Sequence, residues 1–318
     1  MTKSKSGTLR DLLPALPLAA LFLVGFVLPL TVLGALSFFQ SPEFTELGFD
    51  QYRRFADDGL AFSILADTLL IGAEVATLSL CLAYPLGLVY LAAGPRLRTI
   101  LTFLIMLPLL TSTVVRTFAW IVILGREGIV NSIMQALGIW DQPARLIYTW
   151  GGLILALTQI QLPLMALPLI NSLIRLDPTL PKAAEGLGAS RVRVFFTVIL
   201  PLTRPGAVAG WLLVFAAAST AFITQSLIGG GRIILMPLYI YQQAVGEQAW
   251  PFAAALSLIF TAAVIAVVVA VDRLGKDRTA ARTARLKAEA APAASADAGI
   301  AAMVSLKPEQ ADIGRPNA

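Results

Sequence analysis

The feature that most limits how this chain can fold is a series of six apolar runs, each long enough to cross a lipid bilayer. A helix that spans about 30 Å of hydrocarbon needs about 20 largely apolar residues. Backbone groups in lipid must find partners within the segment, so these runs predict helices, and the alternation of a membrane β-barrel is absent. We therefore expect an all-α membrane protein with six transmembrane helices. The predicted spans are 14–39, 63–92, 99–124, 147–174, 206–227 and 250–271.

Composition supports a membrane protein and argues against several other classes. The chain is 57% hydrophobic and 14% charged, whereas a soluble domain is about half apolar and about a quarter charged. It has no histidine and a single cysteine, Cys81, so an internal disulfide is impossible and zinc or haem would lack their commonest ligands. The sequence offers no cluster of a nucleophile and a base that would indicate an enzyme. We expect no metal site and no cofactor bound by this chain.

The basic residues predict the orientation of the chain in the membrane. With the N-terminus inside, eighteen of the 24 Lys and Arg residues fall in cytoplasmic segments, five fall outside, and Arg116 lies within a span. Both termini are therefore expected in the cytoplasm. Because the positive charges are spread over separate loops, the net charge of +5 does not indicate nucleic-acid binding.

Three parts are expected along the chain. Residues 1–11 form a cytoplasmic N-terminus, and the apolar run that follows is too long for a cleaved signal peptide, so we expect a retained anchor. Residues 12–275 form the six-helix domain, which includes a polar loop at 175–205. Residues 276–318 are alanine-rich with scattered charge and cannot bury enough apolar surface to fold alone, which predicts a disordered cytoplasmic tail.

The polar loop 175–205 has the signals of two short helices. Asp177 followed by Pro178 predicts a helix start, and Gly188 is suited to end that helix in the left-handed conformation. Ser190 can cap a second helix, which we expect to stop before Pro201. One face of the first helix carries Leu180, Ala183, Ala184 and Leu187. The pattern fits either an amphipathic element at the membrane surface or a docking element for a cytoplasmic partner.

The sequence KAAEGLGASRVRVFFTVILPLTRPG in this loop resembles the EAA loop of permease subunits of binding-protein-dependent ABC importers. The segments PLLTSTVVRTFAWIVILGREGIVNSIMQALGI and DTLLIGAEVATLSLCLAYPLGLVYLAA, and IYQQ before the last span, resemble the spermidine/putrescine branch of that family. The resemblance covers roughly residues 12–271. The positions that match the motif are Lys182, Ala183, Ala184, Gly188, Ile199, Leu200 and Pro201.

The resemblance implies a type I ABC importer permease (MetI-like) fold with a cytoplasmic coupling helix, in the inner membrane of a bacterium. It implies a second permease subunit, two ATP-binding subunits and an external solute-binding protein as partners, and a polyamine as the best guess for the solute. This chain lacks a phosphate-binding loop, since Gly275-Lys276 is followed by Asp277, so ATP and Mg²⁺ are expected on the partner ATPase. The implied docking residues are Lys182, Ala183, Ala184, Glu185, Leu187, Gly188, Ala189 and Ser190.

Lys182 departs from the family pattern, because the family usually has glutamate at this position. Glu185 can take over the contact, the partner's surface can be altered, or the contact can be dispensable. A Lys182–Glu185 pair within the helix would contribute only about 0.2 to 0.5 kcal/mol. We expect that the cognate ATPase lacks the usual basic partner here.

Three ionisable residues fall within the predicted spans, where they usually face a bundle interior. Asp67 and Glu74 share a helix face in the second span, and Arg116 lies in the third. One interpretation is a structural Asp67–Arg116 pair. The other is that Glu74, with Asp67, offers negative charge to a cationic solute, and that Trp120 supplies a cation-binding face.

Gln159 and Gln161 lie in the fourth span beside Pro163 and Pro168, and amide groups in a kinked helix suit either a pathway lining or a packed kink. The main alternative function is an ion-coupled secondary transporter that uses Asp67, Glu74 and Arg116. Such a transporter would act alone and would need no docking helix.

Overall fold

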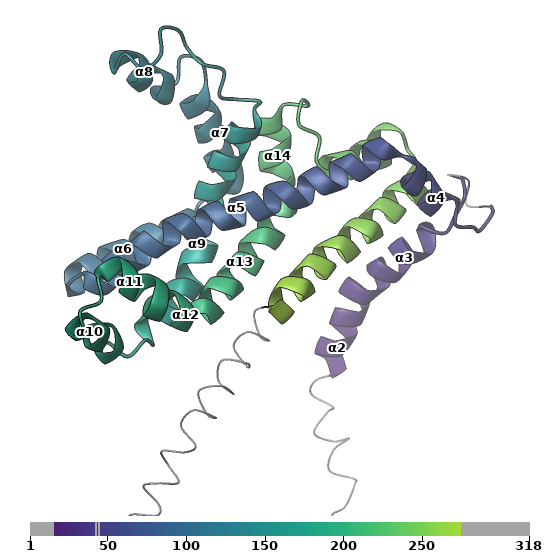
Figure 1. The fold of residues 1–318 in the computed structure, drawn as a ribbon. Coiled ribbons are helices and arrows are strands. Elements are labelled where there is room, and N and C mark those ends of the chain that lie inside the picture. The colour runs from purple at the N-terminus through teal and green to yellow at the C-terminus, as the bar shows by residue number, and fades with distance from the viewer. Residues whose placement is uncertain (1–15, 42, 44, 275–318) are drawn as a thin grey trace, which may run out of the picture. The chain divides into compact units, whose positions relative to one another are not determined.

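The computed structural model describes residues 16–41, 43 and 45–274 of the chain (Figure 1). Helices follow one another through this part, and it holds no strand beyond an isolated bridge between Phe39 and Leu47. The expected all-α class is thus confirmed for the described residues. The chain divides into two compact units, Met1–Val269 and Ala270–Ala318. The predicted N-terminal segment 1–11 and tail 276–318 lie outside the described residues.

Three helices form the centre of the first unit. They are α5 (Gly59–Ala92), α9 (Trp150–Ile174) and α13 (Arg204–Ser219), and each packs against the other two. Each is apolar along its length, as the sequence predicts, so its buried side depends on its neighbours rather than on a polar and an apolar face. Their shared core contains Ile71, Val75, Leu153, Leu157, Met165, Leu169, Leu173, Val214 and Phe215.

Small residues let these helices approach closely. Gly206 and Gly210, four residues apart on α13, face α9: a Cβ at Gly210 would lie 2.8 Å from the sulfur and 3.0 Å from the carbonyl oxygen of Met165. Gly206 faces Ser172 in the same way. In lipid, helix association depends on such close packing, because lipid tails are as apolar as the side chains that would otherwise be buried.

The spans differ from the six continuous helices that the sequence predicts. Three helices are long and apolar enough to cross a membrane, Gly59–Ala92, Trp150–Ile174 and Trp250–Leu274, and up to five spans result if each bent pair of helices counts as one. The described part of the first predicted span is a run of α2 (Leu16–Phe22), η2 (Leu23–Val27) and α3 (Leu28–Leu36).

The predicted third span, 99–124, is broken. It consists of α6 (Pro95–Leu110) and α7 (Thr113–Leu124), and the chain bends by 101° between them. Pro108 lies in the last turn of α6, where it removes a hydrogen-bond donor, and Thr111 and Ser112 adopt extended backbone conformations. The sequence pattern does not predict this break, because the segments before and after it are both apolar.

The predicted fifth span, 206–227, is broken as well. α13 ends at Ser219, and α14 (Phe222–Gly229) begins after Ala221, whose ψ of 63° is not helical. At its other end, α13 follows the helical run Arg191–Leu202 at an angle of 71°. Thus α13 is a separate 16-residue rod that packs on α5 and α9.

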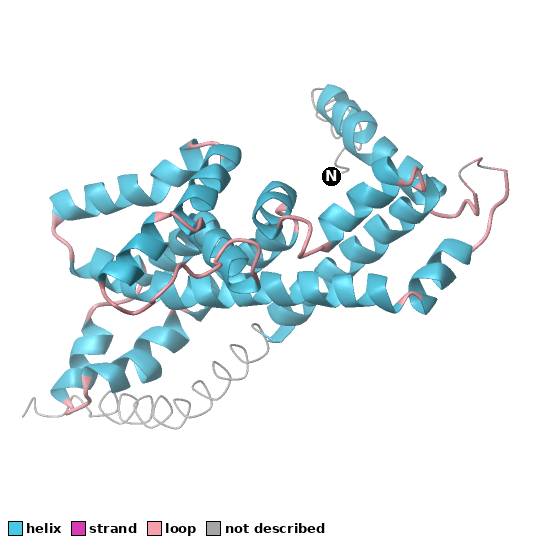
Figure 2. Ribbon diagram, turned by 90° about the horizontal axis from the view of Figure 1, so that it is seen from above, coloured by secondary structure: helices cyan, strands magenta, loops and turns pink. Residues whose placement is uncertain are grey.

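Four further elements are short. They are α4 (Asp50–Asp57), α8 (Ile129–Ala136), α15 (Met236–Tyr241) and η4 (Gln242–Gly246), and Figure 2 shows the loops that connect the helices. A second core joins α15 and the last helix to the beginning of α5, where the buried Thr68 Oγ1 accepts a hydrogen bond from the Met236 N–H at 2.8 Å.

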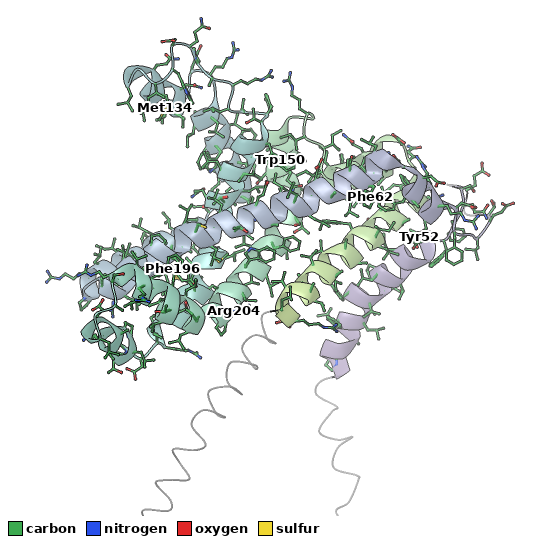
Figure 3. The ribbon with its side chains drawn as sticks, viewed as in Figure 1. Tyr52, Phe62, Met134, Trp150, Phe196 and Arg204 are labelled. Carbon is green, nitrogen blue, oxygen red and sulfur yellow. The ribbon has the colours of Figure 1, made fainter. Side chains whose placement is uncertain are left out.

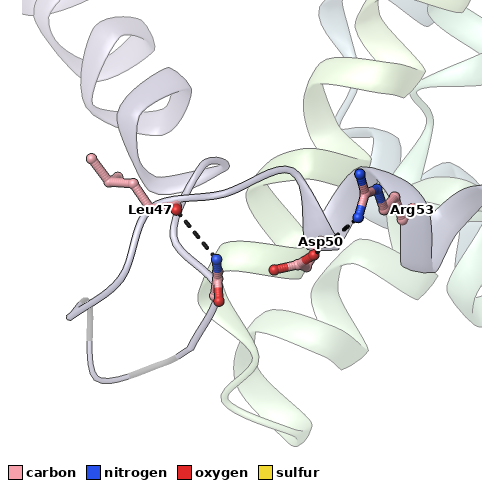
Figure 4. Close-up of polar contacts among 4 residues, drawn as sticks. Leu47, Asp50 and Arg53 are labelled. Carbon is pink, nitrogen blue, oxygen red and sulfur yellow. Dashed lines mark hydrogen bonds and ion pairs between the residues drawn. The ribbon is translucent and has the colours of Figure 1, made fainter.

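The loop before α4 is held by two glutamine side chains. Gln40 Nε2 donates to the Leu47 carbonyl oxygen at 3.2 Å, and Gln51 Nε2 of α4 donates to the Gln40 carbonyl oxygen at 2.7 Å. These bonds tie the loop to the start of α4. Within α4, Arg53 lies 4.0 Å from Asp50 in an exposed pair (Figure 4).

The packing of α13 on α9 yields a stability prediction. We expect Gly210→Ile to lower the free energy of unfolding in detergent by about 1 to 3 kcal/mol, because the new side chain must displace Met165. Gly25→Ile is the matched control, since nothing lies within 4 Å of the position of its Cβ. Equal thermal unfolding of both variants would contradict the close approach.

Candidate functional site

The loop that resembles the EAA motif begins with the predicted cap. The Asp177 carboxylate accepts hydrogen bonds from the Thr179 N–H at 2.9 Å and from the Thr179 hydroxyl at 2.7 Å. These bonds hold the pKa of the Asp177 carboxyl below its usual value. They satisfy a backbone donor at the start of α10 (Thr179–Gly186), which fixes where this helix begins.

The end of α10 also follows the prediction. Gly188 has a φ of +86°, which is the left-handed conformation that glycine adopts without steric cost. Its N–H donates to the Glu185 carbonyl oxygen at 2.9 Å, and the Ala189 N–H donates to that of Ala184 at 3.1 Å. Ser190 Oγ then accepts the Arg193 N–H at 3.3 Å. The turn between the two helices is therefore fixed by backbone bonds.

The second helix of the loop runs further than expected. α11 (Arg191–Val194) leads into η3 (Phe195–Ile199) and α12 (Leu200–Leu202), so the prediction of a stop before Pro201 is wrong. Pro201 lies inside the continuous helical run Arg191–Leu202, where its missing N–H removes one backbone hydrogen bond. The wider turn of η3 precedes it and changes the helical register.

The outer surface of α10 has no cover within the described part of the chain. None of its residues is buried, and the Leu187 side chain that follows it is 89% exposed. Lys182 and Glu185 are both exposed and form no ion pair with each other. Of the eight predicted docking residues, Ala184 and Ala189 are half-buried. Leu180, near the start of α10, is 46% exposed as well, so an apolar side chain is exposed near each end of this helix.

The loop is joined to the central helices through aromatic and hydroxyl groups. The Tyr84 ring of α5 meets the Phe195 ring edge-on at 5.3 Å between centroids, and the Tyr84 hydroxyl lies 3.1 Å from Thr203 Oγ1. Tyr84 and Thr203 are buried. Thr203 directly precedes α13, and Ser172 of α9 donates to its carbonyl oxygen at 3.4 Å. A displacement of α11 would therefore reach all three central helices.

Arg116 does not pair with Asp67. Its Nη1 donates to the Ile160 carbonyl oxygen of α9 at 3.1 Å, and its Nη2 donates to Thr113 Oγ1 at 3.2 Å. Asp67 is exposed on α5. The Asp67–Arg116 pair, one of the two interpretations of these charges, is thus not formed, and the guanidinium bonds to a backbone carbonyl oxygen of the neighbouring helix.

Trp120 also bonds to α9 rather than to a charged group. Its indole N–H donates to Gln159 Oε1 at 3.0 Å, one helical turn beyond Arg116. Pro163 cannot donate to the Gln159 carbonyl oxygen, so α9 is locally weakened where α7 contacts it. Gln161 is half-buried, with no hydrogen-bond partner among the described residues. These contacts suit a packed kink, and a pathway role for the arginine, the tryptophan and the two glutamines stays a prediction.

Glu74 has a partner that the sequence did not indicate. The indole N–H of Trp150, at the start of α9, donates to Glu74 Oε2 at 2.7 Å. Trp150 lies beside α5 in Figure 3. One turn further along α5, Thr77 Oγ1 accepts the indole N–H of Trp211 from α13 at 3.2 Å. Trp150 and Glu74 are 76 positions apart, so only the packing of α9 on α5 brings them together.

The family of the chain follows from comparison with known sequences. The sequence model described as "Binding-protein-dependent transport system inner membrane component" matches residues 79–277, which is more than half of the chain. The chain belongs to this family. The expectation drawn from the EAA-like loop is confirmed, and the family places this permease in a membrane as one component of a transport system.

Curated relatives carry more specific names. The permease is 37% identical over 213 residues to the "Spermidine/putrescine transport system permease protein PotB" of Salmonella typhimurium (strain SL1344), which covers 67% of this chain and 74% of the relative. The protein of the same name from Escherichia coli (strain K12) is 36% identical over 213 residues, covering 67% and 77%.

A solved structure confirms the fold of the permease. It is a crystal structure of a bacterial ABC transporter involved in the import of the acidic polysaccharide alginate, with a TM-score of 0.66, 17% identity, and coverage of 86% of this chain and 98% of the other. At this identity the likeness supports the fold alone.

Whether Asp67 and Arg116 interact can be measured as a coupling energy. We expect Arg116→Met to lower the free energy of unfolding by about 1 to 3 kcal/mol, because two hydrogen bonds from a charged group are lost. Asp67→Asn should have little effect, and the double variant should show a coupling energy near zero in a mutant cycle. A coupling energy above about 1 kcal/mol would instead support a structural pair between Asp67 and Arg116.

Proposed function

We propose that this chain is the membrane-spanning subunit of an ATP-binding-cassette importer that moves a polyamine, such as spermidine or putrescine, into the cytoplasm. The observation that carries the proposal is the 37% identity over 213 residues to a spermidine/putrescine permease. A carboxylate that faces a groove on α5, Glu74, supports a cationic solute. Uptake of labelled spermidine by the assembled complex in vesicles tests it, and saturable uptake of an anion instead would overturn the choice of solute.

The proposed topology has six spans with both termini in the cytoplasm of a bacterium. Two bent helix pairs and the short apolar helix Ala20–Leu36 support the additional spans beyond the three long helices. The excess of basic residues in the even-numbered connections and at both ends supports the orientation.

The proposed partners are a second permease subunit, two ATP-binding subunits and an external solute-binding protein. ATP and Mg²⁺ bind to the ATPase, and this chain docks on it with α10 as the coupling helix. The exposed surface of α10 and the exposed Leu187 support this assignment. A transporter with a similar fold, 17% identical and with a TM-score of 0.69, has been crystallised in complex with a periplasmic protein bound to an alginate pentasaccharide, which supports an external partner. The proposed docking residues are Lys182, Ala183, Ala184, Glu185, Leu187, Gly188, Ala189 and Ser190.

The proposed mechanism is alternating access driven from α10. Closure of the ATPases on nucleotide would displace α10 and, through Phe195, Tyr84 and Thr203, the ends of the central helices. Rigid helices joined by packed side chains transmit such a displacement because a packed core deforms little. The proposed pathway lies along these helices. The residues proposed to line it are Asp67, Glu74, Arg116, Trp120, Gln159 and Gln161.

The alternative, an ion-coupled secondary transporter, receives less support. It requires Asp67, Glu74 and Arg116 to act together, whereas Arg116 bonds to a carbonyl oxygen of α9 and Asp67 is exposed on α5. It also leaves the exposed face of α10 without a role.

Docking through α10 predicts the effect of one substitution at its end. Leu187→Asp should weaken co-purification of the ATPase at least about tenfold, because burying a leucine contributes about 1.5 to 3 kcal/mol and a buried carboxylate opposes binding. Leu137→Asp is the matched control, since this leucine is 65% exposed and follows α8. Unchanged ATPase recovery with Leu187→Asp would contradict the docking role.

Lys182 yields a separate prediction about the partner's surface. If the ATPase lacks the usual basic group, Lys182→Glu should weaken association by about threefold to tenfold, in line with the modest energies of exposed ion pairs. Binding of the purified ATPase to permease in nanodiscs at low salt measures the effect. Tighter binding of the variant would show that an ordinary basic partner faces this position.

A further inference from the structure

A groove on the side of α5 is the strongest candidate for a further site. It has a volume of about 480 Å³, and its floor is one face of α5 with a contribution from α9. It is lined by Ala73, Glu74, Thr77, Leu78, Cys81 and Ile154. Glu74 is its one charged side chain, and most of the remaining wall is apolar.

The Glu74 carboxylate is oriented but not neutralised. Its Oε2 accepts the Trp150 N–H at 2.7 Å, which holds the side chain in one place. Among the described residues, its other oxygen has no hydrogen-bond donor, and no Lys or Arg lies within ion-pair distance of Glu74. A carboxylate with one fixed and one free oxygen is prepared to accept a hydrogen bond from a cation.

Two indole N–H groups orient side chains of the groove. Trp150 donates to Glu74, and Trp211, which stacks on Phe215 with 5.2 Å between ring centroids, donates to Thr77. Both indoles direct their N–H edges at α5, and neither ring lines the groove. The preference for a cation over an anion or a neutral sugar therefore comes from the Glu74 carboxylate.

We propose that the groove lined by Glu74, Thr77 and Cys81 is a station in the translocation pathway that holds one ammonium group of a linear amine. The ammonium binds the free oxygen of Glu74, and the methylene chain lies along the apolar wall formed by Ala73, Leu78 and Ile154. The assignment rests on the proposed import function. The proposal gives this role to Glu74. Asp67, two turns away on α5, lies outside the groove.

The position of Cys81 makes the station measurable. It is the single cysteine of the chain, it is exposed, and it lines the groove two helical turns from Glu74, about 10 Å along the axis. A thiol reagent therefore reports on this groove alone within the chain. A Cys81→Ser variant provides the blank, and partner subunits are used in cysteine-free form.

The test compares a cationic with an anionic methanethiosulfonate reagent on the full chain in the assembled complex. We expect the ethylammonium reagent to react faster than the ethylsulfonate reagent, relative to their rates with free thiol, by about twofold to tenfold for charges at this distance. Glu74→Gln should remove this preference, whereas Asp57→Asn, which changes an exposed acid of α4 outside the groove, should keep it. Spermidine should slow labelling of the wild type and fail to slow labelling of Glu74→Gln.

Each contrary result overturns the station. Equal relative rates for both reagents, equal protection by spermidine of wild type and Glu74→Gln, or a Cys81 that does not react would each do so. If Glu74→Gln fails to assemble, Trp150→Phe, which loses the orienting bond, must reduce the protection by spermidine. The two failures are distinguishable, because a complex that takes up spermidine in vesicles but fails these labelling tests keeps the proposed function and loses the station.

Discussion

The close approach of α9 and α13 at Gly206 and Gly210 is the contact on which the rest of the permease depends. In lipid, apolar side chains gain little by leaving one set of apolar neighbours for another, so helix association needs dense packing. Gly210 brings the α13 backbone against Met165, and Gly206 brings it against Ser172. This contact in turn fixes Thr203, at the start of α13, and Thr203 holds the Tyr84 hydroxyl of α5. The loop that holds α10 and α11 thus reaches the central helices through side chains that the glycine contacts position.

Polar contacts between the helices are few, and tryptophan indoles donate three of these hydrogen bonds. Trp120, Trp150 and Trp211 each donate an N–H to a polar side chain on a neighbouring helix. Two of these bonds join neutral groups, but the third involves a carboxylate. An ionised side chain at the centre of a spanning helix costs about 2.5 to 3.5 kcal/mol, and a hydrogen bond to a charged group returns about 1.5 to 3 kcal/mol. One indole bond therefore offsets the charge of Glu74 in part, and a bound cation would offset the remainder.

Sequence reasoning succeeds here where the signal is local. Three of the six predicted apolar helices, the Asp177 hydrogen bonds at the start of α10 and the left-handed Gly188 are encoded locally, and the structure has them. The break between α6 and α7 is not visible in this way, because an apolar run looks the same whether it is straight or bent. Long-range partners are harder still. Arg116 bonds to a backbone carbonyl oxygen, which every residue possesses, so no residue type in the sequence could have indicated Ile160.

The contacts that hold the helices together and the groove beside them differ in how they depend on charge. The packing of α5, α9 and α13 depends on small and apolar side chains, which are indifferent to the charge of a solute. The groove, by contrast, takes its charge from Glu74 alone among the residues that line it. Exchanging the Glu74 carboxylate for an amide would therefore change what the groove attracts and leave an oxygen to accept the Trp150 N–H, so discrimination by charge can arise within the membrane-spanning chain.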